Sequence, residues 1–288
     1  MKNKFFPIII IGAPRSGTNM LRDIISSQPG FGTWPCDEIN YTWRYGNSGF
    51  PDDELTPGKI TPKIEKYTRK QFSNIARKYK VDYVVEKTCA NCLRLEYVDA
   101  LFPDALYVNI VRDGRDAASS ALKRWEAPLD IPYLLKKVRF VPPGDLPFYA
   151  ARYLKTHAHR LFFSKEKSLS IWGPKFAGYE DIVKTKSIIE VCGIQWLRCV
   201  EKSREVFEKR IAPRRCFQLK YENFVLHPVK QAAGMFDYFK LPYDKSILKA
   251  ECKNVWPGSV GKWKKDLSPQ QQELLSNLLK ADPSGFRA

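Results

Sequence analysis

The sequence lacks the features that divide a chain into separate parts. It contains no Gly/Ser-rich linker, no block of like charge and no internal repeat. Its 288 residues are 44% hydrophobic, which is sufficient for one large core. We therefore predict a single domain over residues 1–288, with insertions near residues 40–80 and 127–180.

Long apolar runs are also absent. The most apolar stretch near the N-terminus, Ile8–Ile11, is short. A membrane-spanning helix needs roughly 20 apolar residues, and a secretory signal needs at least about 7 before a cleavage site. A glycine turn and an arginine follow instead. These flanks favour a buried strand and a cytoplasmic protein, and they leave a peripheral contact with a membrane surface open.

Few residues offer the usual ligands of a metal ion. The seven cysteines are scattered, and the one close pair, Cys89 and Cys92, has no second pair at zinc-site spacing. We therefore expect reduced thiols and no bound metal. Only three histidines occur. His157 and His159 fall in a predicted helix and His227 follows a separate motif, so all three are poor candidates for a general base.

Negative charge is scarce relative to positive charge. The chain has 48 Lys and Arg residues against 31 Asp and Glu residues, which gives a net charge of +17. Such a field favours anionic partners, such as nucleotides, nucleic acid, acidic polysaccharide or an anionic membrane, without choosing among them. Basic and aromatic residues are not interleaved as in nucleic-acid platforms, so we expect no specific nucleic acid.

What the chain does contain is an alternation of strand and helix patterns. Short runs rich in β-branched and aromatic residues predict strands at 8–11, 83–85, 106–111 and 216–219. Helical periodicity lies between them, at 19–26, 93–101, 116–125, 188–210 and 228–239. This order predicts an α/β fold with a central parallel sheet flanked by helices, and a ligand beyond the carboxyl ends of the strands. Residues 51–64 and 127–147 break the alternation, as lids or as surface insertions.

The strongest motif follows the first predicted strand, where residues 12–19 read Gly-Ala-Pro-Arg-Ser-Gly-Thr-Asn. Backbone amides of such a turn, together with the start of a helix, bind anions. Gly12 permits a sharp exit from the strand, and Gly17 lets phosphate approach the backbone. A Walker A sequence would need lysine where Thr18 stands, whereas here Arg15 supplies the cation. With no evident aspartate for magnesium, the loop suits a phosphate-bearing donor that needs no metal.

A second candidate phosphate site follows the third predicted strand. Arg112 ends that strand, and Ser120 lies eight residues later in the next helix. An arginine and a hydroxyl so placed can hold one phosphate from two sides. Arg124 lies on the same helical face as Ser120. It either assists in binding this phosphate or is an ordinary solvated basic residue.

These motifs resemble those of the PAPS-dependent sulfotransferase superfamily, in the style of its tyrosyl-protein, Golgi-type and bacterial members. Residues 14–19 resemble its 5′-phosphosulfate loop, and Arg112 with Ser120 resembles its 3′-phosphate motif. Residues 220–228 resemble the segment that contacts adenine, and residues 255–268 resemble the loop that closes over the nucleotide. The resemblance spans roughly residues 7–270 and implies a P-loop-like three-layer fold, with 3′-phosphoadenosine 5′-phosphosulfate (PAPS) as donor. The donor-binding residues it implies are Arg15, Ser16, Gly17, Thr18, Asn19, Arg112, Ser120, Arg124, Tyr221, Ser259, Gly261, Lys262 and Trp263.

The resemblance also implies a catalytic set. Transfer of a sulfuryl group builds negative charge on the departing oxygen, and Arg15 and Lys87 are the residues expected to stabilise it. Lys87 lies at the end of a predicted strand, which favours a catalytic role. The alternative interpretation is that Lys87 is an ordinary surface lysine. Some branches of the family use a glutamate as general base. After a turn with two additional residues, Glu38 matches that position, with Asp37 as the alternative.

The acceptor is expected to carry a hydroxyl group. Aromatic and basic residues in the insertions could line a site for an anionic sugar, lipid headgroup or peptide: Trp43, Arg44, Tyr45, Tyr133, Lys136, Lys137, Arg139, Trp172 and Lys175. Two other functions compete with sulfuryl transfer. One is a nucleoside-triphosphate-dependent kinase of the P-loop class, and the other is a non-catalytic anion-binding module.

Overall fold

A five-stranded, all-parallel sheet forms the centre of the molecule. The computed structural model describes residues 5–126, 141–142, 144 and 172–280, and all structural statements concern this part of the chain. The strand order is β2-β3-β1-β4-β5. The strands are β1 (Phe6–Ile11), β2 (Phe31–Thr33), β3 (Tyr83–Lys87), β4 (Leu106–Val111) and β5 (Cys216–Lys220). The predicted α/β fold with a parallel sheet is confirmed.

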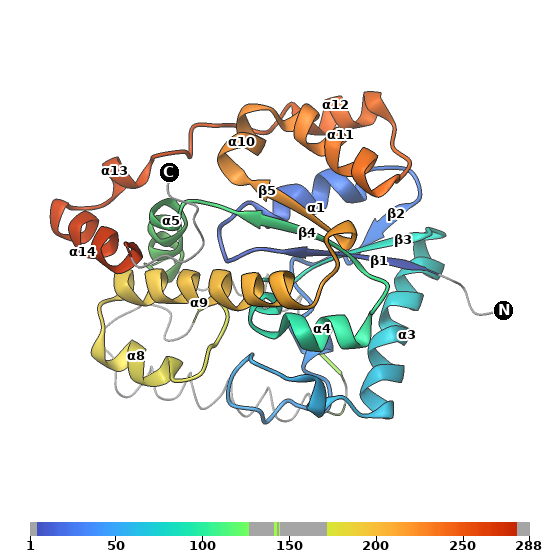
Figure 1. Cartoon of the computed structure of the whole chain (residues 1–288), viewed down its shortest axis with the longest axis horizontal. Coiled ribbons are helices and arrows are strands. Elements are labelled where there is room, and N and C mark those ends of the chain that lie inside the picture. Colours follow the sequence, from blue (N-terminus) through green and yellow to red (C-terminus); the bar gives the residue numbers. More distant parts are fainter. Residues whose placement is uncertain (1–4, 127–140, 143, 145–171, 281–288) are drawn as a thin grey trace.

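Helices cover both faces of this sheet (Figure 1). One face carries α1 (Thr18–Ser26), α10 (Tyr221–Leu226), α11 (Pro228–Phe239) and α12 (Lys245–Cys252). The other carries α3 (Pro62–Tyr79), α4 (Leu95–Leu101), α5 (Gly114–Glu126) and α9 (Ile188–Lys209). The remaining elements are α2 (Asn40–Trp43), η1 (Pro57–Lys59), η2 (Cys89–Arg94), α8 (Tyr179–Thr185), η4 (Pro213–Arg215), α13 (Trp263–Asp266) and α14 (Pro269–Leu279).

The apolar run of β1 explains the three layers. Ile8 and Ile10 pack into the core under α1 and α11, whereas Ile9 and Ile11 pack into the core under α4 and α9. Side chains of a strand alternate between faces, so a strand covered on both sides is apolar throughout. All four isoleucines are fully buried, and each contributes roughly 1.5–3 kcal/mol relative to exposure. A polar substitution at any one of them would remove support from the helical layer that its side chain faces.

Four predicted strands and five predicted helices are present, with shifts of a few residues at their ends. Residues 93–94, which were expected to begin a helix, belong instead to the 3-10 helix η2. The prediction missed β2, which has only three residues with Gly32 at its centre. It also missed α3, whose N-cap Thr61 accepts a hydrogen bond from the Ile64 amide.

The insertion at residues 51–64 packs against the body of the fold. Asp53 and Leu55 are buried within it, and among the described residues of the cavity wall none comes from this insertion. It is therefore not a lid over the site in this structure. Most of residues 127–147 lie outside the described residues. Among the helices that are described, none combines the length and apolarity needed to cross a bilayer.

Candidate active site

The loop between β1 and α1 is shaped by two glycines. Gly17 adopts a left-handed conformation with φ of 85°, and a Cβ there would lie 2.7 Å from the ring of Tyr221. A Cβ on Gly12 would lie 2.8 Å from the Ile110 carbonyl oxygen. Neither position accepts a side chain without movement of its neighbours. Arg15 is also left-handed, with φ of 67°, which is an uncommon conformation for a residue with a side chain.

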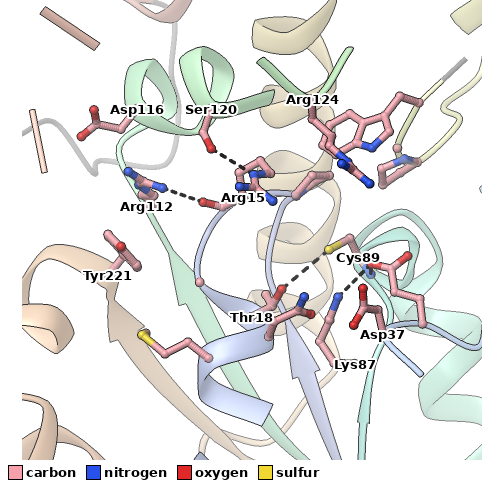
Figure 2. Close-up of a pocket in the computed structure, with 18 of the residues that line it drawn as sticks. Arg15, Thr18, Asp37, Lys87, Cys89, Arg112, Asp116, Ser120, Arg124 and Tyr221 are labelled. Atoms are coloured by element: carbon pink, nitrogen blue, oxygen red, sulfur yellow. Dashed lines mark hydrogen bonds and ion pairs between the residues drawn. The ribbon is translucent and has the colours of Figure 1, made fainter. Parts of the chain in front are cut away.

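This loop meets the second predicted phosphate site directly (Figure 2). The Arg15 Nε–H donates to Ser120 Oγ at 3.0 Å, and the Arg112 guanidinium donates to the Arg15 carbonyl oxygen at 2.9 Å. The Arg112 guanidinium also donates to the Ser259 carbonyl oxygen at 2.7 Å. Tyr221 is bonded to Ser259 Oγ at 2.6 Å. Four segments far apart in sequence therefore converge, as their motifs predict.

One cavity of about 1080 Å³ collects most of the predicted residues. Its wall contains all three predicted catalytic residues and Asp37. Its wall also contains ten of the thirteen predicted donor ligands: Arg15, Gly17, Thr18, Asn19, Arg112, Ser120, Arg124, Tyr221, Ser259 and Lys262. The predicted ligands that do not line it are Ser16, Gly261 and Trp263.

Gly261 and Trp263 instead hold the C-terminal loop in place. The Asp116 carboxylate accepts hydrogen bonds from the Gly261 amide at 2.7 Å and from the Trp263 amide at 3.0 Å. Trp263 is buried, with the Arg115 guanidinium 4.6 Å from its ring centroid. The sequence analysis missed Asp116, although a carboxylate in the first turn after Arg112 was visible as a signal.

The wall of the cavity has hydrogen-bonding capacity that the protein leaves unused. Arg112 Nε and Ser119 Oγ are buried and have no hydrogen-bond partner among the described residues. Leaving such groups unpaired costs about 1–3 kcal/mol each. Ser16 Oγ, behind the loop, is in the same state. An anion with several acceptor oxygens fits this arrangement, and the sequence analysis missed Ser119.

Electrostatics in this part of the cavity also favour an anion. Arg15, Arg112, Arg124 and Lys262 all line it. Burial, together with the neighbouring guanidinium groups of Arg112 and Arg124, lowers the pKa of Arg15 below its ordinary value. A bound polyanion would offset this repulsion between like charges.

A carboxylate–ammonium pair lies beside this cationic region. Lys87, at the end of β3, donates from Nζ to Glu38 Oε1 at 3.0 Å, and the Cys89 amide donates to the same oxygen at 3.3 Å. Burial acts to lower the pKa of Lys87, but Cys89 and Glu38 together raise it above its ordinary value, so the ammonium stays protonated. Asp37 forms an ion pair with Arg22, with 3.6 Å between Asp37 Oδ1 and Arg22 Nη1.

Cys89 contributes a thiol to the same wall. Its Sγ lies 3.8 Å from Thr18 Oγ1. Burial raises the pKa of this thiol, which makes it a poor nucleophile. All seven cysteines lie in the described part of the chain, and none of them forms a disulfide bond. His227 is exposed and away from the cavity, while His157 and His159 lie outside the described residues.

A turn at residues 172–174 forms another part of the cavity wall. Trp172, Gly173 and Pro174 line the cavity together with Asn40 and Tyr41. The buried side chain of Gln195 on α9 donates to the carbonyl oxygens of residues 172 and 174, at 3.0 and 2.9 Å. These two bonds hold the backbone of the turn against α9.

Most of the described residues that were expected to bind the acceptor instead pack in the core, stack on another ring or form ion pairs with other residues. Trp43 lies in the core, Tyr45 stacks on Tyr67, Arg44 pairs with Asp53 at 3.0 Å, and Lys175 pairs with Glu180 at 3.1 Å. Among the described candidates, only Trp172 lines the cavity. Tyr133, Lys136, Lys137 and Arg139 lie outside the described residues.

Comparison with known proteins identifies the family of the chain. Residues 7–197 match the model of a family described as "Sulfotransferase family". Protein-tyrosine sulfotransferase 1 of Danio rerio is 22% identical over 262 residues, which cover 86% of this chain and 57% of that protein. The chain thus spans a little over half the length of this relative.

Solved structures of low sequence identity share the fold. The sulfotransferase domain from the curacin biosynthetic pathway superposes with a TM-score of 0.56 at 13% identity, covering 96% of this chain and 98% of that domain. Mouse sulfotransferase SULT7A1, solved in complex with PAP, superposes with a TM-score of 0.50 at 14% identity, covering 99% and 88%. The P-loop-like three-layer fold is therefore confirmed.

Proposed function

Because this chain belongs to the sulfotransferase family, we propose that it transfers a sulfuryl group from PAPS to an acceptor hydroxyl. The observation that carries this proposal is the joining of two anion-binding motifs in one cavity. Arg15 from the first motif is bonded to Ser120 from the second. A donor with phosphate groups at both its 5′ and 3′ positions needs two such sites within one molecule's length.

The donor's two ends have separate sets of ligands in this proposal. Arg15, Thr18 and the amides at the start of α1 bind the 5′-phosphosulfate. Arg112, Ser119 and Ser120 bind the 3′-phosphate, and the unused hydrogen-bonding capacity of Arg112 Nε and Ser119 Oγ supports this. Lys262 also lines the cavity and supplies a cation from the C-terminal loop.

The chemistry is an in-line displacement at sulfur. A bond forms between the acceptor oxygen and sulfur while the bond from sulfur to the bridging phosphate oxygen breaks. Glu38 accepts the proton of the acceptor hydroxyl, and Lys87 and Arg15 stabilise the charge that develops on the departing oxygen. The contact between Glu38 and Lys87 supports these roles, because it places a carboxylate and a cation side by side in the cavity wall.

Near Glu38 and Lys87, where the acceptor is proposed to bind, the described residues of the cavity wall include aromatic rings and carboxylates. Tyr41 and Trp172 line the cavity, and so do Asp37 and Glu38. Arg44 and Lys175 form ion pairs away from the cavity. We propose that the acceptor's body packs on the aromatic pair while its hydroxyl points toward Glu38.

Incubation with radiolabelled PAPS and a panel of hydroxyl compounds tests the function. We expect label transfer without added metal, and we expect adenosine 3′,5′-bisphosphate to raise the melting temperature. Adenosine 5′-phosphosulfate, which lacks the 3′-phosphate, should raise it much less. Transfer of label from ATP with Mg²⁺, and none from PAPS, would show that the chain is a kinase instead.

A further inference from the structure

A buried polar network lies directly behind the pair formed by Glu38 and Lys87. Thr88 is fully buried and does not line the cavity. Its hydroxyl oxygen accepts a hydrogen bond from the backbone amide of Ile39 at 3.2 Å, and its hydroxyl proton is donated to Glu86 Oε1 at 2.5 Å. Thr88 therefore holds the backbone immediately after Glu38.

Strand geometry explains why these residues face away from the cavity. Successive side chains of a strand point in opposite directions. Lys87, at the end of β3, lines the cavity, while its neighbours Glu86 and Thr88 are buried behind it. One short segment thus presents a cation to the cavity and directs a hydroxyl and a carboxyl to the loop that carries Glu38.

The network continues from Glu86 toward the acceptor wall. The Asn91 amide donates to Glu86 Oε2 at 2.9 Å, and Arg94 Nε donates to the Asn91 side-chain oxygen at 2.9 Å. Arg94 pairs with Asp53 at 3.4 Å. The Asp53 carboxylate also accepts from the backbone amide of Lys175 at 2.9 Å. The backbone immediately after Glu38 and the backbone immediately after the turn at 172–174 are therefore bonded to the same buried chain of groups.

Stability alone does not explain this arrangement. Buried polar and charged groups lose hydration, and apolar residues of similar volume often give equal or greater stability. What a fully bonded polar network provides is a unique geometry. That geometry matters here because a base misplaced by about 1 Å can cost 10²-fold in rate.

We propose that Thr88 is a positioning residue, whose hydroxyl sets the Glu38 carboxylate against Lys87 and the Cys89 amide. The proposal rests on the proposed role of Glu38 as general base. Thr88 touches neither donor nor acceptor. Its loss should therefore lower kcat and leave the binding of the donor unchanged.

The test compares Thr88→Val, which replaces the hydroxyl by a methyl group of similar size, with Thr88→Ser, which keeps the hydroxyl. We expect T88V to lower kcat about 10- to 100-fold, with the KM for PAPS within about twofold of wild type. We expect T88S to restore kcat to within about threefold of wild type. The melting-temperature rise with adenosine 3′,5′-bisphosphate should be the same in all three proteins.

Thr68 provides a matched control. It is also a fully buried threonine, on α3, but its hydroxyl has no partner among the described residues. Thr68→Val should leave kcat unchanged. This control separates loss of a buried hydroxyl in general from loss of the one bonded to Ile39 and Glu86.

Three outcomes overturn the proposal: wild-type kcat in T88V, equal losses in T88V and T88S, or a loss in T88V that appears only in the KM for PAPS. If T88V does not fold while T68V does, Thr88→Ala replaces T88V in the test. A kcat of Thr88→Ala equal to that of T88S would then overturn the proposal. A wild-type protein without turnover of PAPS would refute the proposed function itself, whereas the ratio of T88V to T88S tests only the role of Thr88.

Discussion

The two ends of the cavity are built in different ways. The donor end consists of short contiguous motifs at strand ends, and its cations Arg15, Arg112 and Lys262 face the cavity. At the acceptor end, the ionic pair of Glu38 and Lys87 is held from behind by buried side chains. This difference shows that local backbone features are sufficient to form a site for a highly charged ligand. By contrast, a site that must orient a proton acceptor also depends on buried side chains behind it.

The largest effect should come from the reacting groups at the acceptor end. Replacing Glu38 by alanine removes the proposed proton acceptor, and we expect kcat to fall about 10²- to 10⁴-fold. The fold should survive, because the Glu38 side chain is partly exposed. Steady-state kinetics of Glu38→Ala and of Asp37→Asn, each compared with wild type, measures this fall in kcat. Near-normal activity in E38A with a large loss in D37N would transfer the role to Asp37.

At the donor end, loss of a cation should affect binding more than chemistry. In Arg112→Ala we expect the KM for PAPS to rise about 10- to 100-fold, because a charge-assisted hydrogen bond to phosphate is lost. Discrimination against adenosine 5′-phosphosulfate should weaken. Arg69→Ala, on the surface of α3, serves as control. A drop confined to kcat would contradict the division between the two ends.

The buried carboxyl behind the acceptor end should make stability depend on pH. Burial raises the pKa of Glu86 to about 7 from its ordinary 4.5. Between these values the unfolded chain releases the proton and the folded chain keeps it, so stability falls as pH rises through this range. For Glu86→Gln we expect this loss, on the order of 2 kcal/mol between pH 5 and 8, to disappear. Urea unfolding at both pH values measures it, and an unchanged pH dependence would contradict it.

The smallest effect is expected at the aromatic wall. Trp172→Ala removes a ring that the acceptor would contact, and we expect the acceptor KM to rise by about 3- to 10-fold with the PAPS KM unchanged. Tyr79→Ala, a partly exposed aromatic outside the cavity wall, is the control. Equal changes in both KM values would indicate that the two ends are not independent.

The fold and the donor end could be predicted from sequence because their signals are local. A strand such as Ile8–Ile11 is visible in its own residues, and Arg112 and Ser120 have fixed spacing on one strand–helix unit. The missed helix α3 also had local signals, namely Pro62 after a capping threonine and buried residues at 64, 68 and 72. Its stripe contains a threonine, and this weakens the apolar pattern.

The acceptor end was less predictable because its partners are far apart in sequence. Arg44 and Lys175 were expected to face an acceptor, but each found a buried or neighbouring carboxylate that no sequence spacing indicates. Thr88 and Asp116 act through contacts 49 and more than 140 residues distant. Such roles depend on tertiary packing and not on a motif.

The bond from Arg112 to Ser259 has a consequence for the order of assembly during synthesis. Arg112 holds the loop of Arg15 on one side and the Ser259 carbonyl on the other, and Ser259 is made 147 residues after Arg112. The sheet can form from β1, β3 and β4 well before that residue leaves the ribosome. The part of the cavity wall that Ser259 and Lys262 form can be completed only after that point. PAPS would therefore stabilise only chains that have passed this point, and the donor would act on finished enzyme without assisting earlier folding steps.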